Sequence, residues 1–248
     1  MTVDLRVRLH QWASDLEPRV NRERLASGVS AAADLIVFPE AFARDFGEPG
    51  SDVSPFAETL SGPFATEVTD RASSAGTTVL AGMFEQSADP QRPYNTVLVA
   101  GAASTAYRKI HLFDSFGYRE SDRLSSGALT PVVFDVNGWR IGLLTCYDLR
   151  FPELARRLVE EGAEVLVVPA AWLPGPGKVQ HWRTLLSARA IENTVYVVGV
   201  GQPAPRYCGN SLVIGPLGEV VAEAGAEQTT VEATLVRASL ASARRTNP

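Results

Sequence analysis

The chain has 248 residues, of which 45% are hydrophobic and 21% charged, and 23 Lys+Arg against 28 Asp+Glu give a formal net charge of −5. This composition excludes a disordered chain, and the mild acidity argues against a nucleic-acid-binding protein, which would carry a basic face. No apolar run approaches the roughly 18–20 residues that cross a bilayer, so a membrane span is excluded as well.

Short β-branched runs alternate with amphipathic stretches along the chain. After a first strand around His10, nine runs predict buried strands, at 35–38, 78–81, 96–99, 132–136, 141–145, 165–168, 195–200, 212–214 and 231–235. Helices are predicted over residues 20–33, 64–75, 152–161 and 181–193. This alternation is typical of an α/β architecture.

The spacing of these elements favours one domain over residues 1–248. The Gly/Pro-rich stretches at 46–55, 174–177 and 201–209 are too short to be interdomain linkers and predict surface loops. Closely spaced strands at 132–145 and 212–235 predict hairpins. Two mixed sheets packed face to face with helices outside would accommodate these strands. The last stretch, from about residue 238 to 248, is expected to be a loose tail or a partner-contacting arm.

Cys146 directly follows the apolar run 141–145 and precedes a stretch that leads into a helix. A strand–turn–helix junction projects a side chain at the mouth of a sheet, as in the nucleophile elbow of serine hydrolases. A buried cysteine that packs as a small hydrophobe is the commoner case. The polar neighbours Asp148 and Arg150 are unusual next to a thiol that packs in the core. From the residues alone, both the nucleophile and the core-packing role of Cys146 stay open.

A thiol nucleophile needs a proton acceptor, because the thiolate is the reactive form. The three histidines, His10, His111 and His181, are more typical of structural positions. Glu40 is better placed, because it follows a proline at the end of a buried strand, where a carboxylate is partly desolvated. The alternative is a glutamate that caps the next helix or faces water.

Lys109 is the candidate for the positive charge. Its neighbours Ile110 and Leu112 are apolar, so the ammonium could project into a pocket and stabilise a thiolate and a tetrahedral oxyanion. Glu120 is a second acid able to hold that ammonium in place. A solvent-facing lysine and a surface salt bridge are the alternatives.

Several other kinds of site have no motif in the sequence. There is no Gly-x-Ser-x-Gly, so a serine hydrolase of the usual type is not expected; there is no Cys-x-x-Cys and no His-Glu-x-x-His, so neither redox nor zinc chemistry is expected; and there is no phosphate-binding Gly-Lys-Ser/Thr. The two cysteines, Cys146 and Cys208, exclude a disulfide-stapled scaffold and suit a reducing compartment. The charged N-terminus lacks the apolar stretch of a secretory signal, so a cytoplasmic location is expected.

Three segments together carry a family resemblance. They are Phe-Pro-Glu at 38–40, Tyr-Arg-Lys-Ile-His-Leu-Phe-Asp at 107–114 and Thr-Cys-Tyr-Asp-Leu-Arg-Phe-Pro-Glu at 145–153. They resemble, in order, the three catalytic signatures of the nitrilase superfamily, the carbon–nitrogen hydrolases. The likeness runs over nearly the whole chain, through Ala-Arg-Ala-Ile-Glu-Asn at 188–193 to Gly-Pro-Leu-Gly at 215–218.

The resemblance implies a role for each matching residue. Glu40 matches the general base, Lys109 the lysine that stabilises the tetrahedral intermediate, and Cys146 the nucleophile. Glu120 matches a second glutamate that holds the lysine or positions the substrate. The implied fold is an αββα sandwich that pairs into an αββα–αββα homodimer, with no metal or organic cofactor.

The residues around Cys146 resemble one branch of the superfamily. Cys-Tyr-Asp at 146–148 is similar to the amidase-type branches, whereas true nitrilases usually show Cys-Trp-Glu. The longer string is most similar to the branch that hydrolyses ω-amides of small dicarboxylic acids or of deaminated glutathione. The implied reaction is thiol-dependent hydrolysis of the amide of a small carboxylated molecule, with release of ammonia. Alternatives are N-carbamoyl hydrolase or nitrilase specificity, or a catalytically silent binding member.

Position along the chain suggests which residues bind this substrate. Phe116, Tyr147 and Trp172 are the aromatic candidates to line the pocket, with ordinary core packing as the alternative. A carboxylate-bearing substrate would need a cation, and the candidates are Arg44, Arg119 and Arg150. Arg150 could equally be the partner of a supporting salt bridge.

Overall fold

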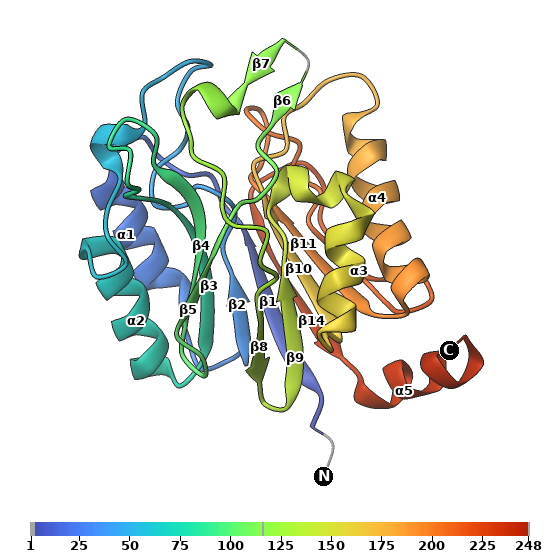
Figure 1. Ribbon diagram of the computed structural model, residues 1–248. Coiled ribbons are helices and arrows are strands. Elements are labelled where there is room, and N and C mark those ends of the chain that lie inside the picture. The colour runs from blue at the N-terminus through green and yellow to red at the C-terminus, as the bar shows by residue number, and fades with distance from the viewer. Residues whose placement is uncertain (1–2, 116, 248) are drawn as a thin grey trace.

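The computed structural model describes residues 3–115 and 117–247 of the chain. Two six-stranded sheets pack face to face, with helices on both outer sides, as Figure 1 shows. This arrangement confirms the predicted αββα sandwich of mixed sheets. A two-stranded hairpin of β6 (Asp114–Ser115) and β7 (Tyr118–Arg119) stands at one end of the sandwich (Figure 1).

The first sheet has the strand order β14-β1-β2-β3-β4-β5. Its strands are β1 (Leu5–Gln11), β2 (Leu35–Val37), β3 (Thr78–Glu85), β4 (Tyr94–Ala100), β5 (Thr105–Arg108) and β14 (Thr229–Leu235). Strands β1, β2 and β3 run parallel, and the remaining pairs are antiparallel. Helices α1 (Pro18–Gly28) and α2 (Pro63–Ala75) cover the outer face.

The second sheet repeats this plan with the order β13-β12-β11-β10-β9-β8. Its strands are β8 (Val133–Val136), β9 (Trp139–Leu143), β10 (Val165–Ala170), β11 (Tyr196–Gly201), β12 (Leu212–Ile214) and β13 (Val220–Glu223). Strands β9, β10 and β11 are parallel. Helices α3 (Pro152–Glu160) and α4 (Lys178–Asn193) lie outside it (Figure 1).

Side chains from both sheets fill the space between them. Leu9 and Val37 from the first sheet share one buried cluster with Leu143 and Val167 from the second. A separate cluster, which includes Phe64 of α2, packs the first sheet against its helices. Strands buried on both faces explain why the sequence shows continuous apolar runs rather than alternation.

The predicted hairpins are confirmed only in part. Strands β8 and β9 form one hairpin and β12 and β13 another. The run at 231–235 does not join the second of these, because β14 crosses to the first sheet and pairs antiparallel with β1, from Leu5↔Leu235 to Gln11↔Thr229. There its buried residues Val231 and Leu235 contribute to the core between the sheets.

The stretch from residue 238, expected to be a loose tail or an arm, forms most of a helix, α5 (Arg237–Thr246). Leu240 and Ala243, spaced three residues apart, are buried on one side of it. After the helix, the Asn247 side-chain amide donates a hydrogen bond to the Thr194 hydroxyl at 3.2 Å.

The short helices are η1 (Ser54–Phe56), η2 (Glu120–Asp122) and η3 (Cys146–Arg150).

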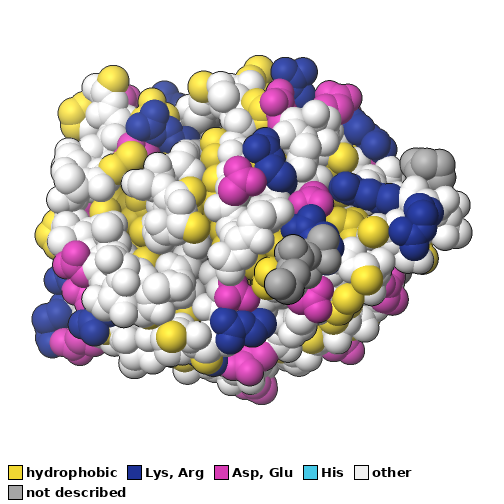
Figure 2. Space-filling model, turned by 90° about the horizontal axis from the view of Figure 1, so that it is seen from below, with side chains coloured by type: hydrophobic (Ala, Val, Ile, Leu, Met, Phe, Trp, Pro, Cys, Tyr) yellow, Lys and Arg dark blue, Asp and Glu magenta, His cyan; other side chains and the backbone are white. Residues whose placement is uncertain are grey.

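The face of the molecule opposite the β6–β7 hairpin carries interspersed basic and acidic side chains (Figure 2). Within residues 3–115 and 117–247, no helix has both the length and the apolar character needed to span a bilayer.

Candidate active site

A cavity of about 450 Å³ opens where segments that follow strands of both sheets meet. Glu40 follows β2, Lys109 follows β5, Cys146 follows β9, and Trp172 comes shortly after β10. Parallel strands of both sheets therefore deliver side chains at their carboxyl ends, where α/β folds form their sites.

Lys109 lies between two carboxylates inside this cavity. Its Nζ is 3.0 Å from Glu40 Oε1, 3.1 Å from Glu120 Oε1 and 2.9 Å from Glu120 Oε2. All three side chains are buried. Burial alone would lower the pKa of Lys109, but the charges of Glu120 and Glu40 outweigh it and raise this pKa well above its usual value. The lysine is therefore a fixed positive charge.

The Glu40 carboxylate is held by groups from both sheets. Oε1 accepts hydrogen bonds from the Asn95 amide at 2.7 Å and from Lys109, and Oε2 accepts one from the Ala171 backbone N–H at 2.6 Å. The Gln202 amide donates to the Glu40 carbonyl oxygen at 3.0 Å. These contacts fix both the backbone and the carboxylate of Glu40, so the carboxylate is held in one orientation.

The backbone at Glu40 is also closely packed. A Cβ on Gly82 of β3 would lie 2.4 Å from the Ala41 nitrogen and 2.8 Å from the Glu40 Cα, so glycine alone allows this approach. Ala41 itself has φ +54°, a left-handed conformation that is uncommon for a residue with a Cβ. The chain thus turns sharply directly after the carboxylate.

Cys146 occupies a comparable turn on the other sheet. It begins η3 three residues after Leu143, the last residue of β9, and its φ of +48° is again left-handed. Burial raises the pKa of the thiol well above its usual value, and Glu40 raises it further, while Lys109 lowers it. At neutral pH the thiol is therefore protonated, and Glu40, the candidate proton acceptor, lines the same cavity.

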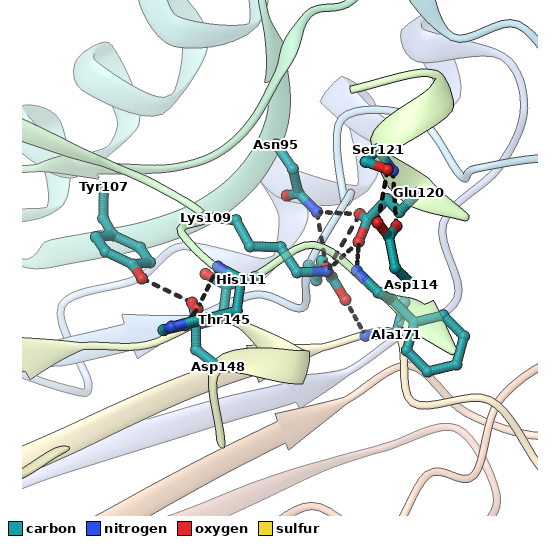
Figure 3. A network of polar contacts seen from close by, with 12 residues as sticks. Asn95, Tyr107, Lys109, His111, Asp114, Glu120, Ser121, Thr145, Asp148 and Ala171 are labelled. Carbon is teal, nitrogen blue, oxygen red and sulfur yellow. Dashed lines mark hydrogen bonds and ion pairs between the residues drawn. The ribbon is translucent and has the colours of Figure 1, made fainter. Parts of the chain in front are cut away.

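Glu120 and Asp148 brace the chain on either side of Lys109, as Figure 3 shows. Glu120 accepts a hydrogen bond from the Phe113 N–H at 2.6 Å in addition to its contacts with the ammonium. Asp148 accepts from the Tyr107 hydroxyl at 2.6 Å and from the backbone N–H of His111 at 2.9 Å. The segment that carries Lys109 is therefore fastened before and after the lysine.

The aromatic and cationic residues that were predicted to bind substrate differ in whether they line the cavity. Tyr147 and Trp172 line the cavity, whereas Phe116 lies outside the described residues. Arg150 is not a lining residue. Its guanidinium lies over the Trp172 ring, 5.3 Å from the centroid, and its Nη2 is 3.3 Å from His181 Nδ1.

The other two predicted cations are engaged away from the cavity. Arg44 Nη1 donates to the carbonyl oxygens of Asp45 and Phe46, at 2.7 and 3.1 Å. Arg119 is largely exposed and lies 3.5 Å from Asp122. Neither side chain lines the cavity.

Asn95, Arg123, Lys178 and Arg206 are among the contributors to the cavity region that were not predicted from the sequence. Asn95 reaches Glu40 from within β4, and its only signal is a polar residue in an otherwise apolar strand. Arg123, Lys178 and Arg206 line the cavity from loops and a helix start that lie far apart in the sequence. No local pattern marks them, because their proximity depends on the packing of the two sheets.

The described residues, 3–115 and 117–247, contain no group of three or more His, Cys, Asp or Glu side chains arranged to hold a metal ion. Glu40 and Glu120 instead hold Lys109. What this arrangement offers chemically is a thiol, a carboxylate in the same cavity, and a fixed positive charge.

Comparison with known proteins gives concordant matches. The carbon-nitrogen hydrolase profile matches residues 6–245. Deaminated glutathione amidase of Escherichia coli O157:H7 is 38% identical over 89% of this chain and 88% of its own. Omega-amidase NIT2 of Xenopus tropicalis is 32% identical over 87% of this chain and 81% of its own. A crystal structure of a CN-hydrolase superfamily protein from Xanthomonas campestris, with an arsenic adduct in its active site, matches with a TM-score of 0.89 and 30% identity, covering 100% of this chain and 96% of that one.

Proposed function

The chain belongs to the carbon–nitrogen hydrolase family, and we propose that it hydrolyses the amide of a small carboxylated molecule through a thioester on Cys146, with release of ammonia. The observation that carries this proposal is the position of the Lys109 ammonium, 3.0 Å from Glu40 and 2.9 Å from Glu120 in the cavity that Cys146 lines. A nucleophile, a base and a cation within one small cavity suit acyl transfer.

In the first step Glu40 takes the thiol proton as the sulfur of Cys146 attacks the amide carbon. Glu40 suits this role because its carboxylate lines the same cavity as the thiol, whose raised pKa keeps the proton on sulfur until substrate is present. The carbonyl oxygen becomes an oxyanion. The Lys109 ammonium and the backbone N–H groups near Tyr147 stabilise that charge.

In the second step the carbon–nitrogen bond breaks. Glu40, now protonated, donates its proton to the departing nitrogen, so that ammonia leaves and the acyl group stays on Cys146 as a thioester. Glu40 then takes a proton from water, which attacks the thioester. The second tetrahedral intermediate collapses to the free acid, and the proton returns to the thiolate. Lys109 keeps its proton throughout, because its raised pKa makes it a poor acid.

The names of two relatives support the choice of substrate. They are called deaminated glutathione amidase and omega-amidase. Both names denote an amidase, which favours an amide over a nitrile or an N-carbamoyl substrate for this chain. A cavity of about 450 Å³ also suits a small molecule.

Mass spectrometry of the intact protein, quenched during turnover of glutaramate, tests the proposal. We expect the mass of a glutaryl group on Cys146 and release of ammonia, with both lost in Cys146→Ala. Cys208→Ala is the matched control and should keep both, because Cys208 is not a cavity-lining residue. Normal turnover by Cys146→Ala would overturn the proposal, and an adduct formed only from ureides or nitriles would replace the amide assignment.

A further inference from the structure

Two of the cations that line the cavity already have acidic neighbours. Lys109 is shared by two carboxylates. Arg206 is 2.9 Å from Asp45 and 3.3 Å from Glu48. The charge of each is largely balanced by these acidic neighbours, so neither is well suited to attract an anionic substrate group. Lys178 and Arg123 are the other two lining cations.

Lys178 lies on the inner wall of the cavity. It begins α4 directly after Gly177, and the Trp172 indole N–H donates a hydrogen bond to its carbonyl oxygen at 2.9 Å. Its Nζ lies over two aromatic faces, 4.9 Å from the Trp172 ring centroid and 5.4 Å from that of Phe113. Only 8% of Lys178 is exposed, so a charge pair formed there is screened little by solvent.

The electrostatics of Lys178 favour an incoming anion. Burial lowers the pKa of its ammonium and nearby Arg150 lowers it further, whereas Cys146 acts in the opposite direction. Lys178 and Cys146 line the same cavity. A carboxylate beside Nζ would offset the cost of holding a buried positive charge.

Arg123 is less suited to the same task. Its guanidinium lies over the loop at Gly50, since a Cβ there would come within 3.2 Å of Nη2. The side chain is half-buried, so water and salt screen its charge more strongly than that of Lys178.

We propose that Lys178 binds the carboxylate of the substrate's acyl group, and that the anionic end of the substrate lies against Trp172 and Phe113. This inference rests on the proposed function, because it assumes that the acyl carbon reaches Cys146. It replaces Arg44, Arg119 and Arg150 as carboxylate-binding residues. Glu40 and Glu120 would repel a carboxylate elsewhere in the inner cavity, so Lys178 also sets the direction in which the amide enters.

Two amides of equal carbon number test the proposal: glutaramate, which carries a carboxylate, and pentanamide, which carries a methyl group in its place. Binding is measured calorimetrically to Cys146→Ala, which cannot turn them over, and to Cys146→Ala with Lys178→Met. We expect Lys178→Met to weaken glutaramate binding roughly 10- to 100-fold and to leave pentanamide binding unchanged within about threefold. Lys178→Arg should restore part of the glutaramate affinity.

The matched control is Arg119→Gln in the same background, which removes an exposed positive charge outside the cavity. It should not alter either affinity. The proposal is overturned if Lys178→Met weakens both amides equally, if it leaves glutaramate unaffected, or if glutaramate binds Cys146→Ala no better than pentanamide. Failure of the proposed function would show separately, as a missing thioester on Cys146 in the unmodified chain. Lys178→Gln provides a second variant if Lys178→Met does not fold.

Discussion

Asp148 holds His111 at two points, accepting hydrogen bonds from its backbone N–H at 2.9 Å and from its ring Nδ1 at 2.8 Å. Asp148 comes two residues after Cys146, and His111 two residues after Lys109. The pair therefore fixes the distance between the turn that carries the thiol and the segment that carries the ammonium. The fully buried carboxylate also accepts from the Tyr107 hydroxyl.

The first prediction concerns this carboxylate. Asp148→Asn places an amide group against several donors, so at least one of them loses its acceptor. We expect the free energy of unfolding to fall by a few kcal/mol and kcat to fall more than tenfold, with a smaller change in KM. Urea denaturation and steady-state kinetics measure both. Tyr107→Phe removes one donor and keeps the carboxylate, so it should cost only about 1 kcal/mol. Equal effects of the two variants would contradict the bracing role.

The second prediction separates the two charges that act on the thiol. In a Cys208→Ala background, Lys109→Met should slow alkylation of Cys146 by iodoacetamide between about pH 6 and pH 9, because loss of the ammonium raises the thiol pKa further. Glu40→Gln should speed alkylation, because loss of the carboxylate lowers that pKa. Both variants should nevertheless lose at least about 100-fold in amidase kcat. Rates that change in the same direction for both would contradict this electrostatic account.

The third prediction concerns the close approach of β3 to Glu40. A methyl group on Gly82 would meet the backbone of Glu40 and Ala41 at 2.4–2.8 Å, so Gly82→Ala must displace the carboxylate. We expect kcat to fall by about 100-fold and the free energy of unfolding by about 1–3 kcal/mol. Gly225→Ala is the matched control, since a Cβ at Gly225 would meet nothing within 4 Å. Full activity of Gly82→Ala would show that the position of Glu40 is not critical.

The fourth prediction concerns acid stability. Burial lowers the pKa of His10 to about 4, partly opposed by its hydrogen bond with the Gly28 carbonyl; Arg8 lowers it and Glu232 raises it. Between about pH 6.5 and pH 4 the unfolded state therefore binds a proton that the folded state does not. As pH falls through this window, the free energy of unfolding should fall by roughly 3 kcal/mol from this residue.

Urea denaturation of the unmodified chain and of His10→Gln at several pH values checks this expectation. The variant should lose less stability across the window, whatever its stability at neutral pH. An identical pH dependence for the two proteins would show that His10 is not responsible.

The sequence predicts the two-sheet architecture well, because strands such as β2, β10 and β12 are continuous apolar runs that end within a few residues of their predicted limits. It misses β13 and the β6–β7 hairpin, whose residues are mostly exposed and carry little hydrophobic signal. The partner of β14 could not be predicted either, since pairing between strands 218 to 230 residues apart leaves no local pattern.

The candidate site, too, could be predicted from the sequence only in part. That Glu40, Lys109 and Cys146 lie close together is expected from the family resemblance of the three segments that contain them, whereas from the residues alone each role stays open. Lys178 is not predicted, in part because the predicted helix starts at residue 181 whereas α4 begins three residues earlier, after Gly177 in a left-handed conformation. The homodimer, the cytoplasmic location and the single-domain boundary remain predictions.

The anchoring of Glu40 has a consequence for how the protein responds to heat. Asn95 and Lys109 reach the carboxylate from the first sheet, and the Ala171 N–H reaches it from the second. A slide of one sheet against the other by about an ångström would break the Ala171 contact, which crosses between the sheets, whereas each sheet would keep its own ladder of hydrogen bonds. On heating, the protein should therefore lose activity before it loses the circular dichroism signal of its strands. The highest temperature at which it is active is then set by the contacts between the two sheets rather than by the stability of either sheet.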